Sequence, residues 1–87
     1  MLVTLAEAKK YLRVDYDDED SLVRKFILTG EKLTADTLRK EVEPTPSNKV
    51  AVLYAVAYLF EHREDADMDE LTKSLRYILM TEREAAF

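Results

Sequence analysis

Two acidic runs are the first candidates for chemistry in this sequence. Each run places three carboxylates at the first, third and fifth positions of a twelve-residue calcium loop. They are Asp15, Asp17 and Glu19 in one run, and Asp65, Asp67 and Asp69 in the other. The sixth position needs Gly for its turn, but Asp20 or Glu70 stands there. The twelfth needs a bidentate Glu, but Phe26 or Arg76 stands there. We therefore interpret both runs as solvated caps and loops, and we expect no bound metal.

The other residue types that carry catalysis form no constellation. The chain has no Cys, which excludes a disulfide, a thiolate zinc site and a cysteine nucleophile. His62 is the single His and has no second His for a zinc pair, so we interpret it as a helix-end residue. Gly30 is the single Gly and lies inside an amphipathic stretch, where close helix packing explains it better than a phosphate loop. We assign no catalytic residue and no cofactor, and we expect the protein not to be an enzyme.

Composition predicts a compact helical domain around these residues. Thirteen basic and eighteen acidic residues give a formal charge of -5, so no global basic field draws the chain onto nucleic acid. A hydrophobic fraction of 47% with one Gly and two Pro is too apolar for a disordered segment. We expect one domain over residues 1–87, built as an all-α, compact bundle of about four helices.

Two helices are predicted in the first half of the chain. Thr4 followed by Glu7 is a capping box, which predicts a short helix from Leu5. A loop then leads to an expected N-cap at Asp17 or Asp18. From about residue 19 to residue 40 the apolar positions occupy one face, which predicts a long amphipathic helix.

The opposite side of this long helix carries candidate contact residues. Lys25, Lys32 and Arg39 recur every seven residues as a basic stripe, and Leu28 lies beside them. The stripe is most simply a solvated face, while the alternatives are contact with an acidic subunit face or with phosphate. A large apolar side chain on the polar side of a helix can mark an interface, although single exposed leucines are common.

The third helix is the clearest feature of the sequence. Thr45 is its expected N-cap, with Pro46 at the first helical position. Residues 50–60 are eleven consecutive apolar residues, which surround the helix and need cover on every side. The run is shorter than the 18 or more apolar residues that span a bilayer. This helix is therefore either the centre of the bundle or meets another subunit, and we expect an oligomer.

A fourth helix completes the predicted bundle. Asp67 or Asp69 offers its N-cap. Tyr77 and Met80 are expected to point away from the core. Its core face is predicted to contain Leu71, Leu75, Ile78 and Leu79.

Taken in order, these segments resemble the small head-tail connector proteins of tailed bacteriophages, which are also described as DNA-packaging proteins. The resemblance rests on LAEAKKYLRVD at residues 5–15, DDEDSL at 17–22, LFEHRE at 59–64 and REAAF at 83–87. It covers nearly the whole chain. The linker at residues 41–46 is more compact than in many relatives, so loop contacts between subunits are not carried over.

The resemblance implies a non-enzymatic structural adaptor of a phage or prophage. It implies a homo-oligomeric ring, dodecameric in the virion, which lies below the portal protein and continues the DNA channel. DNA would pass without sequence-specific binding, and a downstream head-completion or tail protein would dock on the ring. The expected location is the head-tail interface of the virion, after assembly in the host bacterial cytoplasm and without membrane contact.

Interface residues are the only site candidates. The helical projection selects Lys25, Leu28, Lys32 and Arg39 for a lateral subunit contact. The terminal motif, through the resemblance, selects Arg83 and Phe87 for docking onto the portal. A terminal Phe is equally interpreted as a residue that packs into the protein's own core. Arg83 has a structural alternative as a cation at the negative end of the last helix. The alternative function is a small helical protein-binding or regulatory module.

Overall fold

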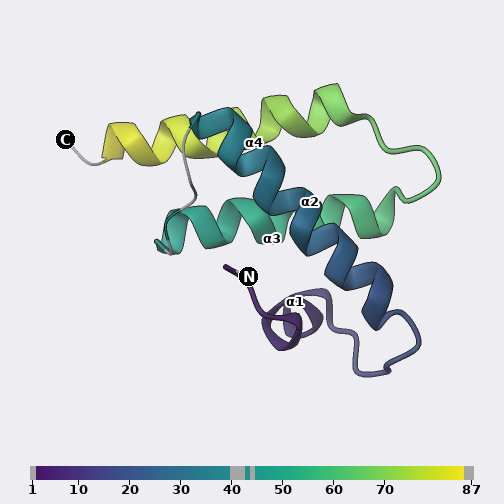
Figure 1. Cartoon of the computed structure of the whole chain (residues 1–87). Helices are drawn as coiled ribbons and strands as arrows, with labels where there is room; N and C mark the ends of the chain where they lie inside the picture. Colours follow the sequence, from purple (N-terminus) through teal and green to yellow (C-terminus); the bar gives the residue numbers. More distant parts are fainter. Residues whose placement is uncertain (1, 40–42, 44, 86–87) are drawn as a thin grey trace.

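The computed structural model describes residues 2–39, 43 and 45–85, with side chains described up to residue 80. This part of the chain forms four helices and no strand. In chain order they are α1 (Leu5–Leu12), α2 (Asp20–Leu38), α3 (Pro46–Glu61) and α4 (Met68–Ala85). Helices α3 and α4 run antiparallel side by side, and α2 crosses them obliquely (Figure 1). Helix α1 lies below α3 in this view. The predicted all-α bundle is confirmed.

The capping box at the start of α1 is confirmed. Thr4 Oγ1 accepts a hydrogen bond from the Glu7 amide at 3.1 Å, and the Glu7 carboxylate accepts one from the Thr4 amide at 3.0 Å. Val3 and Ala8 are both fully buried beside this turn. Arg13 ends the helix in the left-handed conformation. Local chemistry therefore sets both ends of this eight-residue helix.

The predicted N-cap of α2 is wrong. The helix begins at Asp20 and its capping position belongs to Glu19, which is one residue after Asp18 and two after Asp17. The Glu19 side chain makes no capping hydrogen bond, because its carboxylate binds Arg63. Asp17 Oδ1 instead contacts Lys9 Nζ at 2.7 Å. The acidic run is thus engaged in ion pairs that sequence spacing did not reveal.

Gly30 allows α2 and α3 to cross closely. A Cβ atom added at Gly30 would lie 3.2 Å from the Ala55 Cβ and 3.2 Å from the Val52 carbonyl oxygen. These separations are tight for carbon, so a side chain here would push the two helices apart. The prediction of close helix packing at this glycine is confirmed.

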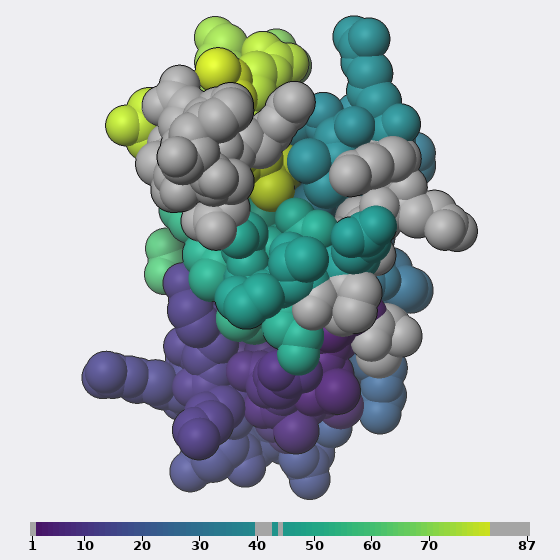
Figure 2. Space-filling model, turned by 90° about the vertical axis from the view of Figure 1, so that its left-hand side faces the viewer, coloured from purple at the N-terminus to yellow at the C-terminus, as the bar shows by residue number. Residues whose placement is uncertain are grey.

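Helix α3 begins as predicted but is not enclosed. Thr45 Oγ1 accepts from the Asn48 amide at 3.2 Å, and Pro46 occupies the first turn. The described residues bury one side of the helix and half-bury its two flanks, where Leu53 and Phe60 on one flank and Tyr54 and Tyr58 on the other pack against buried side chains. Val50 on the outer side is 53% exposed. In the space-filling view the first turns of α3 (teal) lie at the surface between α1 (purple) and α4 (yellow-green) (Figure 2). The expected cover on every side is not supplied by this part of the chain.

Helix α4 starts at the predicted cap. Asp67 Oδ1 accepts from the amides of Asp69 and Glu70, both at 3.1 Å. Tyr77 and Met80 are exposed, as expected. The predicted core face is also confirmed, with Ile78 half-buried and with three buried leucines, Leu71, Leu75 and Leu79.

Two clusters of buried side chains meet along α3. The α1 cluster comprises Val3, Ala8, Val23, Ile27, Val52 and Val56. The α4 cluster comprises Ala51, Ala55, Leu59, Leu71, Leu75 and Leu79. Neighbouring positions of α3 contribute to both clusters, and Phe26 of α2 packs against both. Helix α3 therefore joins the two halves of the bundle.

Candidate functional site

The exposed side of α2 brings together most of the residues predicted for a lateral contact. We call this surface the α2 outer face; its exposed residues are Ser21, Arg24, Lys25, Leu28, Lys32, Asp36 and Arg39. Leu28 is 56% exposed among charged neighbours. Four cations and one carboxylate make the surface net positive in a chain whose formal charge is -5. The α2 outer face can therefore attract an acidic surface.

The ends of this face differ in their surroundings. Lys32 Nζ contacts Asp36 Oδ2 at 3.3 Å, and both side chains are largely exposed, so this pair contributes little to stability. Arg39 lies just past the last helical residue in the left-handed conformation, with its amide bonded to Ala35 O. It borders a hollow of about 400 Å³ between α2 and α4, lined also by Thr72 and Arg76. Lys25, Leu28 and Lys32 form the continuous part of the face.

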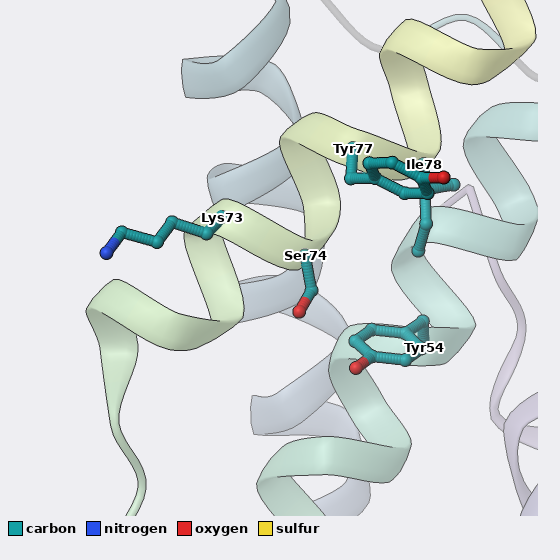
Figure 3. A pocket seen from close by; sticks show the side chains of 5 residues that line it. All are labelled: Tyr54, Lys73, Ser74, Tyr77 and Ile78. Atoms are coloured by element: carbon teal, nitrogen blue, oxygen red, sulfur yellow. The ribbon is translucent and has the colours of Figure 1, made fainter.

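A groove between α3 and α4 is a second candidate surface, and the sequence did not predict it. The residues that line the α3/α4 groove are Pro46, Ser47, Val50, Tyr54, Lys73, Ser74, Tyr77 and Ile78. It contains hollows of about 390 Å³ and 200 Å³, and Ile78 borders both. Tyr54 of α3 lies across the hollow from Ser74, Tyr77 and Ile78 of α4, whereas the Lys73 side chain extends away from them (Figure 3). The all-round apolar pattern of α3 was the only sequence signal for this groove.

The turn between α3 and α4 carries concentrated negative charge. We call this region the acidic turn; its exposed carboxylates belong to Glu61, Glu64, Asp65, Asp67, Asp69 and Glu70. Arg63, the single arginine of the turn, is bound to Glu19 and lies over the Phe60 ring, with its guanidinium carbon 4.9 Å from the ring centroid. The acidic turn complements the charge of the α2 outer face.

The LFEHRE segment holds this turn in place. His62 caps α3 and stacks on Tyr58, with ring centroids 4.4 Å apart, which confirms its predicted place at a helix end. The Tyr58 hydroxyl accepts from the Asp67 amide at 2.9 Å and lies 3.3 Å from the Asp67 carbonyl oxygen. Tyr58, the residue before the LFEHRE segment, thereby connects the end of α3 to the start of α4. Local spacing does not predict these roles of Tyr58 and Arg63, because their partners, Asp67 and Glu19, lie in other segments.

The first acidic run has ionic partners within the fold. Lys9 Nζ contacts Asp17 Oδ1 at 2.7 Å and Asp20 Oδ1 at 2.8 Å. Its hydrogen bonds to these carboxylates raise the pKa of Lys9, and Lys9 lowers the pKa of Asp17. Hydrogen bonds from Thr4 likewise lower the pKa of Glu7. Among the residues that the structure describes, no three His, Cys, Asp or Glu side chains are grouped to hold a metal ion.

The two residues expected to dock onto a portal are not placed by the structure. Arg83 lies within α4, but its side chain is outside the described part, and Phe87 is outside the described residues altogether.

In the described part of the chain, no helix combines the length and the hydropathy that a membrane span requires.

Comparisons with known proteins agree with this helical architecture and with the order of the sequence motifs. Neither the curated proteins nor the solved structures gave a match. The family model described as "Phage gp6-like head-tail connector protein" matches residues 2–83, which is nearly the whole chain. This match confirms the resemblance found in the sequence. The chain therefore belongs to the phage gp6-like head-tail connector family, a family of structural, non-enzymatic proteins.

Proposed function

We propose that this chain forms a ring of identical subunits below the portal vertex, dodecameric in the virion, and joins the capsid to the tail. The family supports a structural adaptor role in the phage particle. The observation that carries the ring is the outer side of α3. Among the residues that the structure describes, Val50 is exposed and Leu53, Tyr54 and Ala57 are only half-buried, so they leave an apolar strip of α3 that a neighbouring subunit would cover.

The α2 outer face supplies a lateral contact in this proposal. A closed ring uses heterologous interfaces, in which two different surfaces of the same chain meet. Lys25, Leu28, Lys32 and Arg39 are exposed on a positive face, whereas the chain as a whole is acidic. Such charge complementarity favours one docking orientation over others.

The ring would conduct DNA without binding it specifically. Net negative charge opposes tight binding to phosphate, which keeps friction low for a sliding duplex. A duplex-binding assay of the assembled ring should show weak binding. Tight, salt-sensitive affinity would contradict this part of the proposal.

Arg83 and Phe87 are proposed to dock the ring onto the portal, and the downstream protein would bind the opposite end. Removal of residues 83–87 tests the docking. We expect portal capture to be lost while the helical circular dichroism is retained. Retention of both portal capture and folding after the deletion would remove the assignment.

Light scattering coupled to size exclusion tests the function itself. The protein is measured at rising concentration and then with the portal encoded near it. We expect a large closed oligomer in solution, or stoichiometric capture by the portal. A monomer or dimer that ignores the portal would instead favour the alternative, a small helical regulatory module.

A further inference from the structure

We propose that Leu28 of one subunit inserts into the α3/α4 groove of the next subunit, with Lys25 and Lys32 directed toward the acidic turn. This inference rests on the proposed ring and assigns both halves of its lateral contact. The occupant of the groove is thus a second copy of this chain.

The groove has the shape and chemistry for an aliphatic side chain. Val50, Tyr54 and Ile78 supply apolar surface, and the hollows of about 390 Å³ and 200 Å³ adjoin at Ile78. Tyr54 and Ile78 face the hollow from two different helices (Figure 3). Insertion of an apolar group would remove this surface from water, which is the main favourable term in such contacts.

Leu28 is the matching projection. It is 56% exposed on a helix face whose other exposed residues are polar or charged. Lys25 and Lys32 lie three and four residues from it, so their side chains flank Leu28 along the same face. The surface is therefore an apolar knob between two positive charges.

The lining of the groove carries one cation, Lys73, whose side chain extends away from the hollow (Figure 3). Carboxylates predominate beside the groove. Glu70 lies one turn before Ser74 on α4, and Glu61 lies two turns after Tyr54 on α3. Both exposed carboxylates thus lie just beyond the lining residues, at the end of the groove that is nearer the acidic turn. The knob and the groove match in apolar character and in charge, and complementary charges steer the encounter of the two surfaces.

The two surfaces lie on opposite sides of the molecule. Helix α2 crosses one side of the α3 and α4 pair (Figure 1), and the groove opens on the other, with α2 behind the pair (Figure 3). One contact therefore leaves a free knob and a free groove at the two ends of the dimer. Repetition of such a heterologous contact generates a ring when the rotation closes.

Mixed single-cysteine chains test this contact, because the protein has no Cys of its own. Arg24→Cys places a thiol one turn from Leu28 on the α2 outer face, and Ser74→Cys places one in the groove. We mix the two variants under mild oxidation, in solution at rising concentration and on the portal. We expect the mixed disulfide to form at least tenfold faster than with Lys10→Cys, an exposed position of α1, in place of Arg24→Cys. Adding Leu28→Asp to the Arg24→Cys chain should remove this advantage.

Three outcomes would overturn the contact. In the first, the mixed disulfide forms no faster than it does with the Lys10→Cys control. In the second, Arg24→Cys chains form a disulfide with one another faster than with Ser74→Cys chains. In the third, Leu28→Asp leaves the rate of mixed-disulfide formation unchanged. Light scattering on the same samples distinguishes a failure of this lateral contact from a failure of the proposed ring. Rings without the mixed disulfide would refute this contact alone, whereas the absence of rings both in solution and on the portal would refute the proposed function.

Charge reversal gives a second, independent readout. Lys25→Glu with Lys32→Glu should reduce assembly, and so should Glu61→Lys with Glu70→Lys. Mixing these two chains should restore assembly in alternating order, because each knob then meets an opposite charge. Lys10→Glu with Arg13→Glu, which makes the same charge change on α1, should leave assembly unchanged. Failure of the mixture to recover would contradict the pairing.

Discussion

The α1 cluster and the α4 cluster are held together by different means. Around α1, buried apolar residues are accompanied by ion pairs between Lys9 and Asp17 and between Glu7 and Lys49, and by a hydrogen bond from the Leu2 amide to Glu31. Around α4, the buried contacts come from leucines on an 18-residue helix. The ion pairs between described side chains all involve α1, α2, α3 or their flanking loops. Most of these ion pairs therefore lie around α1 and the start of α2.

Helix length explains this difference. An eight-residue helix such as α1 is too short to be stable alone and buries only one residue fully, Ala8. It needs caps and ion pairs that fix its position. Helix α4 buries Leu71, Leu75 and Leu79, so apolar contacts contribute most to holding it, beside the cap that Asp67 provides.

The largest expected effect is on the α4 cluster. Leu75→Ala should lower the free energy of unfolding by about 3 kcal/mol, because Leu75 is fully buried and its removal leaves a cavity. Urea denaturation followed by circular dichroism measures this change. Met80→Ala, at an exposed position of the same helix, should change stability by less than about 0.5 kcal/mol. Similar losses for both variants would show that leucine packing does not hold α4.

Gly30 joins the two clusters, so a side chain there should weaken both. Gly30→Leu should destabilise the protein by about 2 kcal/mol, because Ala55 and the Val52 carbonyl leave no room at the crossing. Thermal unfolding should show a lower Tm. Ser21→Leu, at an exposed position of α2, is the matched control and should have little effect. A Gly30→Leu protein as stable as the original would refute the close crossing.

The α1 capping box should have a smaller effect. Thr4→Ala removes the acceptor for the Glu7 amide and should lower stability by about 1 kcal/mol. Thr4→Ser keeps the hydroxyl and should restore most of that loss. Hydrogen exchange of the α1 amides should accelerate in the alanine variant, while that of α4 remains unchanged. Equal acceleration in both helices would contradict the separation of the two clusters.

Acid should loosen α1 before α4. The pKa values of Glu7 and Asp17 are lowered in the folded protein. Their contribution to folding stability is therefore complete above the pKa values of the unfolded chain, and it is lost as the pH falls through the pKa values of the folded protein. We expect the protection of α1 amides to decline below about pH 4. The pKa of Lys9 is raised in the folded protein, so the contribution of Lys9 to folding stability is lost only when the pH rises through that raised pKa. Lys9→Met should remove the Asp17 part of the acid response, and an unchanged profile would contradict the role of this pair.

Much of the bundle could be predicted because its signals are local. The capping box at Thr4, the cap and proline at Thr45 and Pro46, and the spacing of the leucines in α4 each act within one or two turns. The exposure of Leu28 followed from helical periodicity for the same reason. The order of the weak motifs then identified the family, which the match over residues 2–83 confirmed.

The sequence by itself determined the four helices, their inward faces and the charge of the α2 outer face, because these depend on neighbours a few residues apart. The tertiary structure alone decided that Asp17 binds Lys9 rather than capping α2, since that partner lies in another helix. It also decided that α3 is buried on one side and that a groove opens between α3 and α4. Such surfaces depend on how separate helices pack, and local spacing carries no information about that packing.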